Sequence, residues 1–352
     1  MTTTTLARLA ATLAVGVSSV LALAGPGGTL VILNKSEATA SVLDRETGDT
    51  IATLPTGAGP HEAAVSPDGK TAVIADYGEQ TPGASLTVID LPSMRVTRTI
   101  DLGAPARPHG IQFEPDGVHV AVTAEVRGTL LRVNIETGET VASIPTDQQA
   151  SHMVVLSPDG ARAYVSNIAS GSVSVLDLEA GRLVTIIETG DGAEGLDVTP
   201  NGSELWVGNR ANDTVTVIDT ETLEVVEQLR CGRFPIRVKV TPDGGRVLVS
   251  CAASGEVAVF DSKTRRELAR IPMVEEDGEN ADEGGNVFTQ GPVPIGILIP
   301  ADGRHAYIAN TNANIVTVID LETYEIVSRL TAGQTPDGMA WSPLDLPNNG
   351  EL

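Results

Sequence analysis

A short turn sequence, Pro-Asp-Gly or Pro-Asn-Gly, recurs along the chain and constrains its fold more than any other feature. Regular copies stand at SPDG 66–69, EPDG 114–117, SPDG 157–160, TPNG 199–202 and TPDG 241–244, with a PADG variant at 300–303 and a degenerate WSPL at 341–344. The proline fixes φ, and the glycine supplies the positive φ that a tight hairpin needs. A turn that returns about every 42 residues, with four β-patterned runs per unit, is typical of propeller blades.

Residues 194–229 illustrate how one unit is built. The runs EGLDVTP, ELWVGN, TVTVIDT and VVEQL follow one another, separated by short turn sequences. The third run alternates β-branched residues with a period of two, as a half-buried strand does. Each unit therefore predicts four consecutive antiparallel strands.

The two ends of the chain complete one blade between them. Seven turn copies imply seven first strands, and the last of these is PDGMAWSP near the C-terminus. The N-terminal runs TLVILNK, ASVLDRE and DTIATLP match strands two, three and four of a blade. We therefore predict an all-β, seven-bladed β-propeller with four-stranded blades as a single domain over residues 25–352. Its ring is closed by N-terminal strands two to four plus a C-terminal inner strand, which leaves no free sheet edge at the joint.

The N-terminus and the net charge suggest where the protein works and what it avoids. Residues 1–24 form a small and apolar run that ends on Ala-Leu-Ala, which is typical of a cleaved signal peptide; a membrane anchor is the alternative. We expect a periplasmic or secreted monomer with no membrane span. The formal net charge of −23 disfavours nucleic acid and anionic membranes as partners, because both need a basic surface.

Three of the five histidines share one position in the repeat. His61, His109 and His152 each stand at the entrance of a predicted first strand, where Glu194 and Asp337 stand in two other blades. In a propeller these strands line the central channel, so we expect the three rings to meet at one mouth. They could hold a divalent metal such as zinc, iron or copper, with Glu194 as a fourth ligand or general base. The alternative is a polar channel lining that binds nothing.

Other polar residues are expected at the same mouth. Arg210 and Arg237 could bind an anionic ligand, or they could pair with neighbouring acids. Further ligand-binding candidates are Asp337, at the entrance of the last inner strand, and Asn167, Asn209 and Asn310, at the ends of the second strands. These amides could instead satisfy the loop backbone. The acidic segment 274–292 could cover the channel or offer oxygens to calcium, or it could be a solvated loop.

The only two cysteines, Cys231 and Cys251, fall in the same predicted blade and on the same face. In an oxidising compartment this placement predicts a disulfide. A reactive thiol pair and a soft-metal site are the alternatives.

The second strands YVSN (164–167), WVGN (206–209) and YIAN (307–310) are each followed by a V-x-V-[IL]-D run. With the recurring turn, they make the chain resemble the YVTN-repeat β-propellers, which include the YncE-like group. The resemblance covers essentially the whole predicted mature chain. It implies an exported seven-bladed propeller, but propellers host so many activities that it implies no function.

Two hypotheses for the function follow. The first is an exported binding module that presents a ligand or divalent-metal site at the histidine-rich channel mouth, to a small anionic ligand or to a protein on the loop-rich face. The second is a periplasmic metal-dependent lyase or hydrolase acting on a small anionic substrate. In the second, Glu194 is a metal ligand or general base and Arg237 orients the substrate. No motif in the sequence names a reaction.

Overall fold

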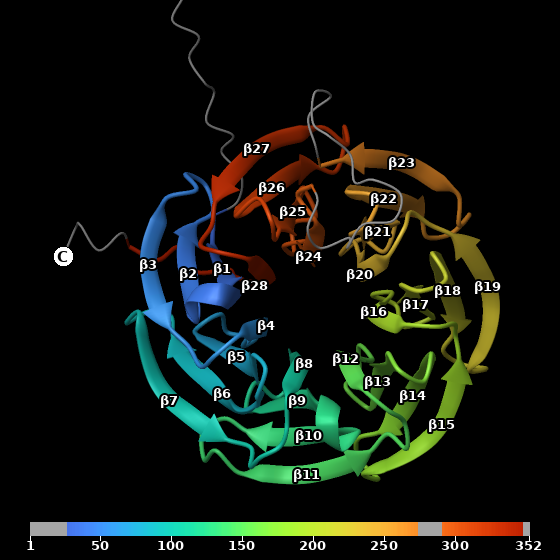
Figure 1. Cartoon of the computed structure of the whole chain (residues 1–352), viewed down its shortest axis with the longest axis horizontal. Coiled ribbons are helices and arrows are strands. Elements are labelled where there is room, and N and C mark those ends of the chain that lie inside the picture. Colours follow the sequence, from blue (N-terminus) through green and yellow to red (C-terminus); the bar gives the residue numbers. More distant parts are fainter. Residues whose placement is uncertain (1–26, 274–290, 348–352) are drawn as a thin grey trace, which may run out of the picture.

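The computed structural model describes residues 27–273 and 291–347, and within them the chain forms seven four-stranded antiparallel sheets. The sheets stand around a common centre as the blades of a propeller (Figure 1). This arrangement confirms the predicted all-β, seven-bladed fold. The predicted signal peptide and most of the acidic segment, residues 274–290, lie outside the described residues.

Each blade runs from an inner strand at the channel to an outer strand at the rim (Figure 1). The inner strands are β4 (Pro60–Val65), β8 (Pro108–Phe113), β12 (Ser151–Leu156), β16 (Ala193–Val198), β20 (Pro235–Val240), β24 (Pro294–Leu298) and β28 (Pro336–Ser342). The second strands are β1 (Thr29–Asn34), β5 (Thr71–Gly78), β9 (His119–Ala124), β13 (Arg162–Asn167), β17 (Glu204–Asn209), β21 (Arg246–Cys251) and β25 (His305–Asn310).

The outer half of each blade is built in the same order. The third strands are β2 (Thr39–Asp44), β6 (Pro82–Asp90), β10 (Thr129–Asn134), β14 (Ser172–Asp177), β18 (Thr214–Asp219), β22 (Glu256–Asp261) and β26 (Ile315–Asp320). The fourth strands are β3 (Thr50–Pro55), β7 (Arg95–Asp101), β11 (Thr140–Pro145), β15 (Arg182–Glu188), β19 (Glu224–Arg230), β23 (Glu267–Pro272) and β27 (Ile326–Thr331). Two short 3-10 helices, η1 (Lys35–Glu37) and η2 (Glu125–Arg127), follow the second strands β1 and β9.

Burial follows the position of a strand within its blade. Every residue of β1 is buried, because the second strand packs against a neighbouring blade on each face. The fourth strand β19 is almost wholly exposed, because it forms the rim of the ring. The core is therefore a set of apolar layers between blades, and Trp206 and Tyr164 are its largest fully buried side chains.

The recurring turn has the expected geometry. In its first copy, the Ser66 hydroxyl and the Lys70 amide donate hydrogen bonds to Asp68 Oδ1 at 2.6 and 3.1 Å. Gly69 has a φ of +77°, a conformation that L side chains rarely adopt. The turn thus closes the hairpin between the first and second strands, as the Pro-Asp-Gly sequence predicts.

The ring closes by pairing strands from the two ends of the chain. The C-terminal strand β28 pairs antiparallel with the N-terminal strand β1, with the partners Thr29↔Ser342, Leu30↔Trp341 and Val31↔Ala340. A further link is the hydrogen bond from the Ser342 hydroxyl to Gly69 O at 2.7 Å, which ties β28 to the next blade. The predicted closure of one blade by both chain ends is confirmed. In the described ranges no helix is both long and apolar enough to cross a bilayer.

Removing the closing strand should destabilise the whole ring. Deletion of residues 336–352 would leave the inner edge of β1 without its partner and would open the contacts of β28 with β4 and β24. We expect the melting temperature to fall by more than about 10 °C, or folding to fail. A control that lacks only residues 348–352 should melt within about two degrees of the intact chain. Equal melting of the two truncations would show that β28 does not close the ring.

Candidate functional site

The second residue of each inner strand lies at one level of the channel. Five of these seven residues are polar or charged, and all five side chains are buried: His61, His109, His152, Glu194 and Asp337. The three histidine rings form a stack. The ring centroids of His61 and His109 are 4.0 Å apart, and those of His109 and His152 are 3.5 Å apart. His109 is therefore enclosed between the other two rings.

Glycines let neighbouring inner strands approach closely enough for this stack to form. Gly110 directly follows His109, and a Cβ built on it would lie 2.6 Å from the backbone nitrogen of Val154 in the next blade. A Cβ on Gly338, which directly follows Asp337, would lie 2.2 Å from the carbonyl oxygen of His61. A side chain at either position would force the strands apart.

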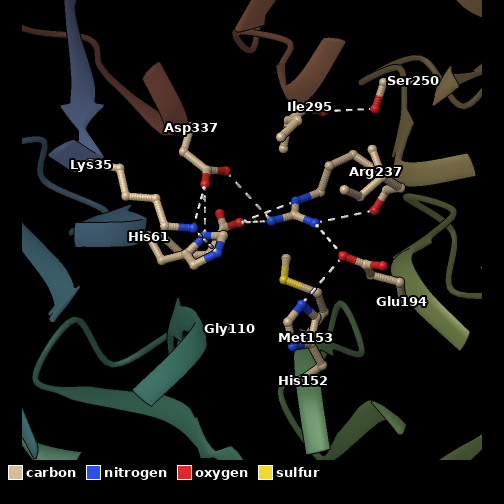
Figure 2. Close-up of polar contacts among 12 residues, drawn as sticks. Lys35, His61, Gly110, His152, Met153, Glu194, Arg237, Ser250, Ile295 and Asp337 are labelled. Carbon is tan, nitrogen blue, oxygen red and sulfur yellow. Dashed lines mark hydrogen bonds and ion pairs between the residues drawn. The ribbon is translucent and has the colours of Figure 1, made fainter. Parts of the chain in front are cut away.

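His61 is held between Lys35 and Asp337. Its Nε2 lies 2.8 Å from the Lys35 ammonium, and its Nδ1 lies 3.2 Å from Asp337 Oδ2 (Figure 2). An ammonium group only donates hydrogen bonds, so Nε2 is the acceptor and the ring proton is on Nδ1, facing the carboxylate. Burial and the positive charges of Lys35 and Arg237 hold the pKa of His61 well below its usual value. His61 is therefore neutral.

His152 is held between two carboxylates. Its Nδ1 lies 2.8 Å from Glu125 Oε2, and its Nε2 lies 3.4 Å from Glu194 Oε1. Burial alone would lower the pKa of His152, but the hydrogen bonds to Glu125 and Glu194 outweigh it and raise that pKa. Burial alone would raise the pKa of Glu194, but His152 and Arg210 outweigh it and hold that pKa below the usual value. The pair is best described as an imidazolium and a carboxylate.

His109 has no partner for either ring nitrogen among the described residues. Its side chain is completely buried, and neither Nδ1 nor Nε2 has a hydrogen bond to the protein. Burial and the neighbouring His152 and His61 hold the pKa of His109 well below its usual value, so the ring is neutral. A neutral imidazole offers one donor and one acceptor, and both are unused here. Both nitrogens are also inaccessible to solvent, so a water molecule, a substrate or a metal ion could bind there only if neighbouring side chains move.

Arg237 reaches across the channel and is surrounded by acids (Figure 2). Its Nη2 and Nε lie 2.5 and 3.1 Å from Glu62 Oε1. Nη1 lies 3.5 Å from Glu194 Oε1, and Nη2 lies 3.9 Å from Asp337 Oδ1. On the loop side, Arg210 donates to Glu194 Oε2 at 2.7 Å. An anionic ligand at either arginine would have to compete with these carboxylates, so the predicted role of both arginines in binding anions stays a prediction.

Four residues of this cluster were missed from the sequence. Glu62 is the third residue of its inner strand, a position at which four other blades have glycine. A glutamate in place of that glycine could have identified Glu62 as a channel residue from the sequence. Lys35 and Glu125 lie in η1 and η2, directly after second strands, where no sequence pattern marks them. Tyr77 lies with its ring centroid 4.8 Å from that of His61, and its hydroxyl donates to Glu125 at 3.3 Å.

Within the channel, His61, Glu62 and His109 offer a metal ion a compact set of ligands. Their ligand atoms all lie within 4.8 Å of one another. The expected set of three histidines and Glu194 is brought to one level, but both nitrogens of His152 face carboxylates and Glu194 faces His152. Arg237 binds Glu62 through Oε1, so the geometry favours Glu62 over His152 and Glu194 as a third ligand only through its other oxygen, Oε2.

Away from the channel, a second acidic group lies near the recurring turn of β8 and β9. The ligand atoms of Glu114, Asp116 and His119 also lie within 4.8 Å of one another. Glu114 is already bound by Arg132 through two hydrogen bonds of 2.6 Å, which leaves no free carboxylate for an ion.

A cavity of about 380 Å³ lies in the channel directly beside the charged cluster. Glu62, Met153 and Arg237 line it at the end nearest the histidines, and Pro67 of the first recurring turn lines it toward the opposite face. All seven inner strands contribute to its wall. A small molecule could therefore reach Glu62 and Arg237 from the face that carries the Pro-Asp-Gly turns, whereas the sequence led us to expect access from the loop-rich face.

The amides at the ends of the second strands point into their own blades. Asn167, Asn209 and Asn310 are fully buried, and each donates from Nδ2 to a hydroxyl of its third strand. For Asn209 that bond, to Thr216 Oγ1, is 2.8 Å long. These contacts hold the second strand to the third, so a direct contact of the amides with a ligand remains a prediction.

Asp76 replaces the amide in one blade. Its carboxylate accepts hydrogen bonds from the Gly57 amide at 3.0 Å, from the Ser85 hydroxyl at 2.7 Å and from the Thr87 hydroxyl. Burial nevertheless raises the pKa of Asp76 to about 6, against the effect of those hydrogen bonds. Above that pH the blade contains a buried carboxylate where four of the other six blades have a neutral amide.

Asp76→Asn should stabilise the protein at neutral pH. Since the folded-state pKa is raised, the contribution of Asp76 is fully favourable below about pH 4 and is lost as the pH rises through about 6. We expect the variant to gain about 1–3 kcal/mol in unfolding free energy at pH 7.5 relative to pH 4, measured by urea unfolding. The control Asp68→Asn removes an exposed turn carboxylate whose pKa is lowered by Ser66, and should show the opposite pH trend. A gain independent of pH would contradict this interpretation.

The cysteines lie in contact in one blade. Cys231 and Cys251 are free thiols with their sulfur atoms 3.4 Å apart, so the predicted disulfide is not formed in this structure. The hydrogen bond between the two thiols, together with burial, raises the pKa of Cys251 well above its usual value. A disulfide needs the sulfurs to close to about 2.05 Å, a small movement from this contact.

If the protein is exported, as its N-terminus predicts, we expect Cys231 and Cys251 to form a disulfide there. Denatured, unreduced protein from the oxidising compartment should then show no free thiol and a mass about 2 Da below that of the reduced chain. The Cys251→Ser variant should show one titratable thiol under the same conditions. Two free thiols in the unreduced protein would favour the thiol pair or the soft-metal site.

Comparison with known proteins places this geometry in a family. A model of the family described as lactonase, 7-bladed beta-propeller, matches residues 3–272. This is a propeller family related to, but distinct from, the YVTN-repeat group, so the resemblance seen in the sequence is supported only at the level of the propeller superfamily. A search of curated proteins returned no significant match.

Two solved structures share the fold. Hydrazine synthase of Kuenenia stuttgartiensis aligns with a TM-score of 0.66 and 23% identity, over 80% of this chain and 88% of that chain. A functionally unknown protein from Desulfotomaculum acetoxidans DSM 771 aligns with a TM-score of 0.73 and 14% identity, over 90% of this chain and 100% of that chain. At such identities the likeness concerns the fold alone. On the evidence of the family model, which matches most of its length, the chain belongs to the lactonase, seven-bladed β-propeller family.

Proposed function

We propose that the channel site binds a lactone or a related small ester and hydrolyses it, with His109 as the general base. The observation that carries the proposal is the pair of unused nitrogens on the buried, neutral His109 ring. The description of the family as a lactonase family supports the choice of substrate class.

His109 suits the role better than its two neighbours. A general base needs a free lone pair on a neutral ring. The lone pair of His61 faces the Lys35 ammonium at 2.8 Å, and His152 is an imidazolium between two carboxylates. Only His109 combines neutrality with an unused acceptor.

The reaction consumes one water molecule. His109 accepts a proton from the water as its oxygen attacks the ester carbonyl, and a tetrahedral intermediate forms. The ring C–O bond then breaks, and the same proton passes to the leaving alkoxide, which gives a hydroxy acid. The negative charge on the carbonyl oxygen would be stabilised by Arg237, whose contacts with Glu194 and Asp337 are its longest, and by the His152 imidazolium.

Substitution of His109 should abolish most of the hydrolysis. With γ-butyrolactone and δ-valerolactone as probes in a pH-stat, His109→Ala and His109→Gln should each lower kcat about 10²- to 10⁴-fold. Because the pKa of His109 is lowered, its base form persists on acidification, so the acidic limb of the kcat/KM profile should lie below about pH 6.5. His305→Ala, on a second strand away from the channel, should stay within about twofold of the wild type.

Two outcomes would change the assignment. Full activity in both His109 variants would exclude His109 as the base. Binding of the probes by calorimetry with no proton release would leave a binding module, the other function that the sequence suggests, in which the same side chains hold a ligand without turnover.

A divalent metal site is the second candidate function, and the compact set of His61, Glu62 and His109 favours it. Zinc, iron or copper bound there would supply a Lewis acid and an activated water. His61 would have to exchange its contact with Lys35 for the metal.

Calorimetric titration with zinc, iron or copper tests this candidate directly. We expect His109→Ala and Glu62→Gln to weaken binding at least about tenfold, and His305→Ala to leave it unchanged. Equal binding by all four proteins would exclude the site. Hydrolysis that survives a chelator would separate the metal site from the proposed reaction.

A further inference from the structure

The cavity beside the charged cluster has two chemically different sides. One residue from each inner strand lies in the same register along its wall, in ring order Ala64, Gln112, Val155, Asp197, Lys239, Leu298 and Ala340. Three of the four apolar members, Leu298, Ala340 and Ala64, come together on β24, β28 and β4, where the partly exposed Trp341, Ala63 and Val65 add to them; the fourth, Val155, lies among the polar members. Partly exposed apolar side chains inside a channel favour binding of an apolar ligand, because the ligand removes their surface from water.

On the side of the cavity opposite these apolar residues, most polar groups already form hydrogen bonds within the protein. Gln112 Oε1 accepts a hydrogen bond from the Leu156 amide at 2.9 Å, and Asp197 Oδ2 accepts one from the Val240 amide at 2.9 Å. The exception is Lys239, whose side chain is 44% exposed and whose ammonium lies 3.7 Å from Asp197. It stands two residues after Arg237 on β20, so both cations face the same side of their strand.

The size of the cavity limits the ligand. Arg237 is the third residue of its inner strand and Trp341 is the sixth residue of another. The cavity wall between these two levels is therefore three residues long, about 10 Å, which matches an extended chain of roughly six to eight carbons.

We infer that the cavity binds a medium-length alkyl chain carried by the lactone. The ester lies at Glu62 and Arg237, and the chain extends along Leu298 and Val65 toward the Pro-Asp-Gly turns. The inference rests on the proposed hydrolysis for the position of the ester, but the binding of the chain depends only on the cavity wall.

A neutral ester fits the end of the cavity nearest the histidines better than a carboxylate does. Arg237 there already faces the carboxylates of Glu62, Glu194 and Asp337, so a further anion would add repulsion. A carbonyl oxygen needs only one donor and brings no charge. After hydrolysis the new carboxylate would be repelled, which favours release of the product.

N-Alkyl-2-pyrrolidinones are suitable probes, because a lactam has the shape of a lactone but resists hydrolysis. Calorimetry with ethyl to dodecyl chains should show Kd tightening about fourfold per methylene, with no further gain beyond roughly eight carbons. Leu298→Gln should flatten this series by placing an amide on the apolar side. Leu268→Gln, an equivalent change on the exposed outer strand β23, should leave the series unchanged.

The outcomes separate this inference from the proposed function. A Kd that does not depend on chain length, or a series that Leu298→Gln leaves intact while the variant melts like the wild type, would overturn the alkyl site. Length-dependent binding of lactams without any His109-dependent hydrolysis of lactones would keep the alkyl site and reject the hydrolase. Hydrolysis with length-independent binding would do the reverse.

Discussion

The pairing of β28 with β1 is the interaction on which both the ring and its site depend. Lys35 follows β1 near the N-terminus and Asp337 lies on β28 near the C-terminus, yet their side chains meet at 3.3 Å beside His61. Lys35 and His61 both lie near the N-terminus, but Asp337 joins them only when the ends of the chain have met. Closure of the ring and completion of the site are therefore one event, and an opened ring would lose the complete site while most of its strands remained.

Burial of charge explains why the three histidines differ although they occupy one register. Four carboxylates and three cationic side chains converge at this level, and buried charges are tolerated only when paired. His152 lies between two acids and completes the pairing as a cation, while His61 and His109 lie nearer the cations and stay neutral. A repeated sequence position thus yields two neutral rings and one charged ring.

The period of the turns was enough to predict seven blades, the closing strand and the shared level of the histidines, because these follow from strand register. The partners of each histidine could not be predicted in that way, since Lys35, Glu62 and Glu125 meet them across blade boundaries. Such contacts depend on how closely the inner strands approach, which Gly110 and Gly338 permit. Likewise, the shared blade of Cys231 and Cys251 predicted the contact of their sulfurs but could not determine their oxidation state.

The buried charged layer has a consequence for traffic through the molecule. His109, Glu194, Arg237 and Asp337 are each at most 5% exposed, so the layer closes the channel at their level. A molecule that enters from the turn-bearing face cannot pass this layer and must leave through the same face. A bound product would then block the next substrate until it dissociates. Product release, rather than bond breaking, would limit the turnover rate.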